Sequence, residues 1–61
     1  MVKLYEVMTF YGTYCKTFEH ERNAIKYACK LSGLLDIDMD LIQIYPFQVT
    51  NEEYIYTYIE D

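Results

Sequence analysis

The chain has 61 residues, of which ten are acidic and five are basic, and its formal net charge is −5 at pH 7. A chain of this length holds one hydrophobic core, so we predict a single domain over residues 1–61. Its apolar runs fall well short of the roughly 18 residues that a membrane span requires. It opens without the apolar segment of a secretory signal. These features exclude a membrane protein and predict a cytoplasmic one.

Basic and acidic residues are segregated along the chain. Residues 1–30 contain all five basic residues and three acidic ones, whereas residues 31–61 contain seven acidic residues and no basic one. Nucleic acid binding depends on Lys and Arg side chains that replace the counterions of phosphates. We therefore expect no direct nucleic acid partner, and predict as partner a larger protein with a basic surface.

The first half of the chain reads as a hairpin followed by a helix. Residues 2–11 and 14–18 are rich in β-branched and aromatic side chains and flank a turn signal at Gly12-Thr13. From residue 21 to residue 32 the apolar side chains recur with a helical period. Gly33 is then expected to stop the helix in the left-handed conformation.

The second half reads as two further strands. Residues 34–40 are expected to form a connection, 41–49 a third strand, 50–52 a turn and 53–59 a fourth strand. Pro46 cannot donate a ladder hydrogen bond, which predicts an edge position or a bulge. The order β-β-α-β-β predicts an α+β fold, with a four-stranded, largely antiparallel sheet and one helix packed on one face.

The alternation of side chains predicts what each face of that sheet carries. One helix covers one face, so we assign the apolar set to that side: Leu4, Met8, Phe10, Ile42, Ile44, Ile55 and Ile59. The open face then receives an aromatic set: Tyr5, Tyr11, Tyr45, Phe47, Tyr54, Tyr56 and Tyr58. Tyrosine gives large contact area with a polar tip, which is typical of interfaces. The alternative is that tyrosine is simply a strand former that tolerates water.

The acidic residues suggest a more specific role. Asp36, Asp38 and Asp40 in an extended segment would project on one side at intervals of about 6–7 Å, a ladder that resembles a phosphate backbone. The same residues match the start of a calcium-binding EF-hand loop, but Leu41 and Phe47 replace the required Gly and Glu. The alternative is a solvated acidic loop.

Catalytic chemistry finds little support in the sequence. His20 is the only histidine and stands at the start of the predicted helix, where it caps the helix or faces solvent. Cys15 and Cys29 are expected to be small buried hydrophobic residues rather than a disulfide. We predict no enzyme, no cofactor and no metal site.

No motif here identifies a protein family. As a small, acidic, stand-alone domain the chain resembles, in general style, the inhibitors and host-takeover proteins of bacteriophages. That resemblance implies an inhibitor in the host cytoplasm. The acidic second half and the tyrosines predict that it occupies a basic site of a larger target, for example a nucleic-acid-binding site, as a DNA mimic. The predicted partner-binding residues are Asp36, Asp38, Asp40, Glu52, Glu53, Tyr54, Tyr56 and Tyr58. The alternative is a structural or regulatory subunit, or a homodimer, that associates through the tyrosine-rich face.

Overall fold

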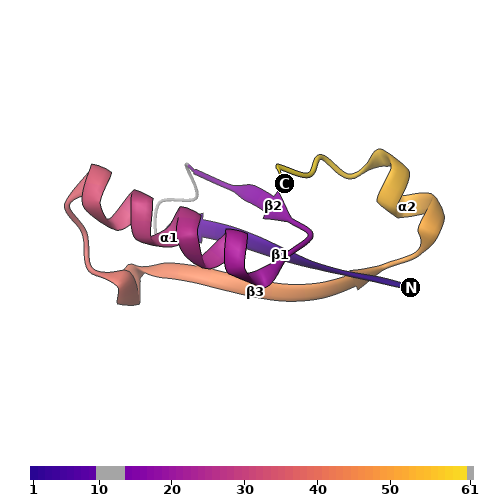
Figure 1. Ribbon diagram of the computed structural model, residues 1–61, viewed down its shortest axis with the longest axis horizontal. Coiled ribbons are helices and arrows are strands. Elements are labelled where there is room, and N and C mark those ends of the chain that lie inside the picture. Colours follow the sequence, from indigo (N-terminus) through magenta and orange to yellow (C-terminus); the bar gives the residue numbers. More distant parts are fainter. Residues whose placement is uncertain (10–13, 61) are drawn as a thin grey trace.

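A computed structural model of the chain describes residues 1–9 and 14–60 and has an α+β fold (Figure 1). Its elements are β1 (Val2–Thr9), β2 (Lys16–Phe18), α1 (Glu21–Leu35), the 3-10 helix η1 (Met39–Leu41), β3 (Ile42–Val49) and α2 (Asn51–Tyr56). The sheet has the order β2-β1-β3, and both neighbouring pairs are antiparallel. Phe10, Tyr11 and the predicted Gly12-Thr13 turn lie outside the described residues.

One core lies between α1 and the sheet. Its buried members are Val7, Phe18, Ala24, Ala28, Leu31 and Ile42. The helix contributes residues at spacings of four and three, which places them on one stripe, and its two alanines allow a close approach to the strands. Ile42 and Ile44, predicted to face the helix, do pack into or against this core.

The assignment of β1 to its two faces was wrong. Val7 lies opposite Ile44, and residues directly opposite each other in antiparallel strands share a face. Val7 and Tyr5 therefore belong to the helix side, where Tyr5 packs against the core. Leu4 and Met8 lie on the other side of the sheet. The sequence misled because β1 carries apolar side chains on both faces.

The second face of the sheet is buried at Leu4 but open at Tyr45, which is 60% exposed. Leu4 lies opposite Phe47 on the face away from α1, yet its exposed fraction is 0%. The segment that follows β3 returns along this part of the molecule, since α2 contacts β3 and the Glu60 amide donates a 2.8 Å hydrogen bond to the Thr17 carbonyl. Figure 1 shows this C-terminal segment running from α2 to β2. Residues 50–60 therefore return from the end of β3 to the β2 edge of the sheet.

The predicted fourth strand is replaced by α2 and an extended tail. Thr50 begins the helix with a capping box: its Oγ1 accepts from the Glu53 amide at 3.2 Å, and its own amide donates to the Glu53 carboxylate at 3.4 Å. This reciprocal pair satisfies two amides that a short helix otherwise leaves open. The sheet thus has three strands, and the predicted β-β-α-β-β order is wrong. Pro46 does lie on an edge strand, because β3 is an outer strand in the order β2-β1-β3.

Helix α1 ends three residues later than predicted. Gly33 lies inside the helix, and Asp36 is the residue with left-handed backbone angles, φ 53° and ψ 50°. The Ile37 amide then donates to the Ser32 carbonyl at 3.2 Å, which closes the end as a Schellman-type turn. Leu35 and Ile37 pack against the core, and that burial extends the helix beyond Gly33.

We expect Gly33→Ala to raise the free energy of unfolding by about 0.5–1 kcal/mol, because alanine is a better residue than glycine inside a helix. A Cβ at Gly33 meets nothing within 4 Å.

Asp36→Ala should instead lower the free energy of unfolding by about 1 kcal/mol, since alanine is strained at positive φ. Urea unfolding of both variants tests the assignment. A loss of stability in Gly33→Ala would instead place the left-handed residue at Gly33.

Candidate functional site

Three highly exposed large apolar side chains lie on the segment after β3. Ile55, Tyr56 and Tyr58 are 74%, 88% and 76% exposed. Glu52 and Glu53, one turn earlier in α2, are also exposed. We call these five residues the C-terminal patch. Apolar groups so open to water within a rim of charge are typical of surfaces that bind a partner.

Side-chain hydrogen bonds hold α2 in place beneath this patch. Tyr54 is half-buried, and its hydroxyl donates to the Glu19 carboxylate at 3.0 Å. The Thr57 hydroxyl donates to the Glu53 carbonyl at 2.8 Å, at the other end of the helix. With Tyr54 turned toward the protein, the next two residues, Ile55 and Tyr56, face outward.

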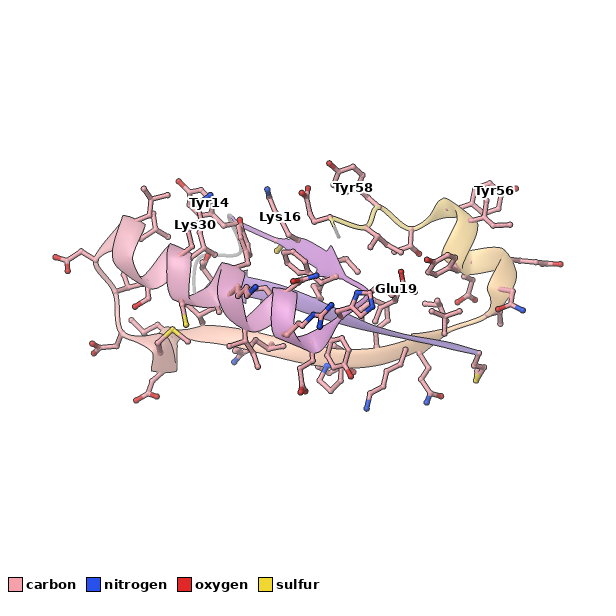
Figure 2. All side chains as sticks on the ribbon, viewed as in Figure 1. Tyr14, Lys16, Glu19, Lys30, Tyr56 and Tyr58 are labelled. Carbon is pink, nitrogen blue, oxygen red and sulfur yellow. The ribbon has the colours of Figure 1, made fainter. Side chains whose placement is uncertain are left out.

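An ion pair between Lys16 and Glu60 attaches the tail that follows α2. Lys16 Nζ lies 3.6 Å from a Glu60 carboxylate oxygen and 5.1 Å from the centre of the Tyr27 ring. A hydrogen bond to the Glu60 carboxylate, together with repulsion from its charge, raises the pKa of Tyr58 above the ordinary tyrosine value. Figure 2 shows Lys16, Tyr58 and Tyr56 following one another along the same edge of the molecule. The tail thus presents Tyr58 beside α2.

The predicted acidic residues fall into two groups at opposite ends of the protein. Glu52, Glu53 and the tyrosines lie at the α2 end, whereas Asp36, Asp38 and Asp40 lie where α1 passes into η1 (Figure 1). The eight residues of β3 run between the two ends, a length of about 26 Å. The sequence prediction of one partner-binding set therefore corresponds to two separate surfaces.

The phosphate-like ladder is not formed. Asp36 is left-handed, Asp38 is extended, and Asp40 lies within η1, so the three carboxylates do not follow one extended strand. Among residues 1–9 and 14–60, no group of His, Cys, Asp or Glu side chains is arranged to hold a metal ion. These aspartates therefore offer a partner their negative charge but not the regular spacing of a phosphate backbone.

The predicted tyrosine-rich sheet face is also not formed. Tyr54, Tyr56 and Tyr58 lie on α2 and the tail, and Tyr5 packs against the α1 core. What remains exposed on the sheet is Tyr45, whose ring stacks on Phe47 at 6.3 Å between centroids. The aromatic surface therefore belongs mainly to the C-terminal segment.

Sequence reasoning placed Ile55 in the core, although it is among the most exposed residues of the patch. The signal that reveals its position is Thr50 followed by Glu53, the capping-box spacing, because it predicts a helix in place of a strand. Leu34, Met39 and Leu41 are further exposed apolar residues, at the α1–η1 end, that the prediction did not include.

Reactive side chains do not gather into a site in the described part of the chain. Residues 1–9 and 14–60 enclose no pocket. The cysteines, predicted to be buried, are both exposed and form no disulfide within these residues. His20 is the N-cap of α1, where its carbonyl accepts from the Asn23 and Ala24 amides at 3.1 and 3.2 Å, but its side chain makes no capping hydrogen bond.

No family model, no curated protein and no solved structure matches this chain. Within the described residues, none of the helices has the length and apolar character needed to cross a bilayer. The properties of the surface itself therefore carry the functional argument.

We expect Thr50→Ala to destabilise α2 locally by about 1 kcal/mol, because it removes the hydroxyl that accepts from the Glu53 amide. Amide hydrogen exchange should become faster at residues 51–56 and stay unchanged in α1. Thr50→Ser keeps the hydroxyl and is the matched control. Equal exchange in the alanine and serine variants would mean that the capping box does not hold α2.

We expect Glu60→Gln to lower the pKa of Tyr58 toward its ordinary value, because Glu60 is the main cause of the raised pKa. A pKa raised in the folded state means that folding favours the protonated phenol. The stabilisation is therefore complete below the ordinary tyrosine pKa of about 10 and is lost as pH rises through the folded-state value. An NMR titration of the Tyr58 ring tests this, with Glu52→Gln as the control that should leave Tyr58 unaffected.

Proposed function

We propose that this protein is a small acidic binding module without catalytic activity of its own, and that its C-terminal patch docks on a basic surface of a larger protein. The observation that supports this most directly is the exposure of Ile55, Tyr56 and Tyr58 next to two carboxylates. Aromatic and aliphatic side chains in the middle of an interface supply most of its binding free energy. Charges at the rim attract the partner and set its orientation.

The charge distribution defines the kind of partner. No basic residue follows Lys30, so the whole segment that carries the patch is free of cations in its sequence. Lys16 forms its ion pair with Glu60, and neither Glu52 nor Glu53 takes part in that pair, although the Glu53 carboxylate also accepts from the Thr50 amide. A Lys- or Arg-rich surface satisfies these carboxylates, whereas a nucleic acid is repelled by them.

A nucleic-acid-binding protein is the target class we favour. Its basic site matches the patch in charge, so a bound module would exclude the nucleic acid from that site and inhibit the target. This is the role implied by the general resemblance to phage inhibitors, and it places the protein in the host cytoplasm. Because the Asp36–Asp40 segment does not form a phosphate-like ladder, we base inhibition on occupation of the site.

A second candidate is a subunit or homodimer held mainly by the same aromatic residues. The exposed area of Tyr56 and Ile55 favours it, since a chain of 61 residues forms a small core and gains stability from a partner. In that case the carboxylates serve solubility, and raising the salt concentration should leave the complex intact. The two candidates therefore differ in their response to salt.

The experiment is a pull-down with the tagged full chain from bacterial lysate, washed at low and at high salt, with and without duplex DNA as competitor. A captured nucleic-acid-handling protein is then titrated calorimetrically with variants of the patch. Tyr56→Ala should weaken binding about ten-fold or more, as expected for an interface hot spot. Glu52→Gln combined with Glu53→Gln should flatten the salt dependence. Tyr45→Ala, which removes an exposed tyrosine from the sheet, is the matched control.

Equal binding by Tyr56→Ala and by the control would count decisively against the patch. A partner that resists high salt and ignores the glutamate substitutions would favour the second candidate. The second candidate includes a subunit of a larger complex and a homodimer. Sedimentation of the protein alone distinguishes them, because a homodimer must show a concentration-dependent mass without any partner.

A further inference from the structure

The end of the molecule opposite α2 carries a second exposed apolar surface. Leu34 at the end of α1 is 70% exposed, and Met39 and Leu41 of η1 are 41% and 42% exposed. Helix α1 contacts η1, so these side chains belong to one end of the fold. Asp36, Asp38 and Asp40 alternate with them along the chain and are all exposed. We call these six residues the α1–η1 surface.

This surface is strongly negative, and no ion pair offsets its charge within the described part of the chain. Among residues 1–9 and 14–60, none of its three carboxylates has an ion-pair partner. The last turn of α1 contains no basic residue, so the partial negative charge of the helix C-terminus adds to that of Asp36. A cation placed here meets three carboxylates and a helix end, and each of them attracts it.

We propose that the α1–η1 surface is a second docking surface, and that its occupant is an amphipathic, Lys/Arg-rich segment of a partner protein. The apolar side chains of that segment cover Leu34, Met39 and Leu41, and its cations pair with the surrounding aspartates. Charge complementarity selects this occupant over nucleic acid, which the surface repels. It also opposes a second copy of the chain, whose own net charge is −5.

This second surface is physically separate from the C-terminal patch. Figure 1 shows α2 and the α1–η1 turn at opposite ends of the long axis, with β3 spanning the distance between them. A partner bound at one end therefore does not displace a partner bound at the other end. The protein then acts as a bridge between two basic surfaces, in addition to any inhibition at the C-terminal patch. The inference does not rest on the function proposed for that patch.

The test uses the full-length, isotope-labelled protein and a defined probe. The probe is a 14-residue peptide of Leu and Lys in a helical period, and its control is the same peptide with Glu in place of Lys. NMR titration should show two groups of shifted amides, at residues 34–41 and at residues 52–58, and calorimetry should show two peptides per chain. The Glu peptide should shift neither group.

Matched variants separate the two ends. The triple variant should bind the peptide about ten-fold more weakly at residues 34–41, with unchanged binding at residues 52–58. Its substitutions are Asp36→Asn, Asp38→Asn and Asp40→Asn. Asparagine tolerates the left-handed conformation of residue 36, so this variant should fold. Glu52→Gln with Glu53→Gln should have the reverse effect.

Each outcome decides between the two proposals. Shifts confined to residues 52–58 would overturn the second surface and leave the C-terminal patch standing. Shifts confined to residues 34–41 would overturn the patch and support the second surface, and no shifts at all would overturn both. Self-association of the protein through residues 34–41 without peptide would show that the occupant is a second copy and overturn the occupant proposed here.

Discussion

The structure depends on the central strand β1, which carries fully buried side chains on both faces. Val7 points to α1 and Leu4 to the opposite face, and each has an exposed fraction of 0%. A sheet of three strands in so small a protein needs apolar cover to be stable. Helix α1 covers one face, and the segment after β3 returns to the β2 edge of the sheet, where the Glu60 amide donates to the Thr17 carbonyl. The position of the C-terminal segment follows from these contacts with the β2 end of the sheet, together with the bond from Tyr54 to Glu19.

That constraint explains how a six-residue helix comes to present a surface. A helix as short as α2 does not persist in water by propensity alone. The capping box at Thr50 begins it, and the bond from Tyr54 to Glu19 anchors it to the end of β2. Because one tyrosine is used for anchoring, Ile55 and Tyr56 on the other side are left in water. The exposure that marks the candidate site is thus a consequence of how the segment is attached.

The predictable part of the fold is the part with one dominant signal. The stripe of Ala24, Ala28 and Leu31 locates α1, and Pro46 correctly indicates an edge strand. The segment 53–59 alternates Tyr and Ile with period two, which favours a strand, while Thr50 and Glu53 favour a helix over the same residues. The cap and the contact with Glu19 decide between them. Similarly, the acidic residues of the second half were predicted as one set, but they lie in two places. β3 separates the aspartates that precede it from the glutamates that follow it, and the sequence does not show how far apart its ends lie.

Segregated charge links stability to binding in this protein. Lys16 pairs with Glu60, whereas the other described carboxylates of residues 31–60 have no ion-pair partner, so neighbouring carboxylates at each end repel one another in the folded state. The core that opposes this repulsion is small, with Ala24 and Ala28 among its six fully packed members. A cationic partner at either end removes repulsion that the folded state carries, and by mass action it stabilises that state further. In the complexes that we propose, a basic partner therefore reduces the repulsion between neighbouring carboxylates at the end that it covers.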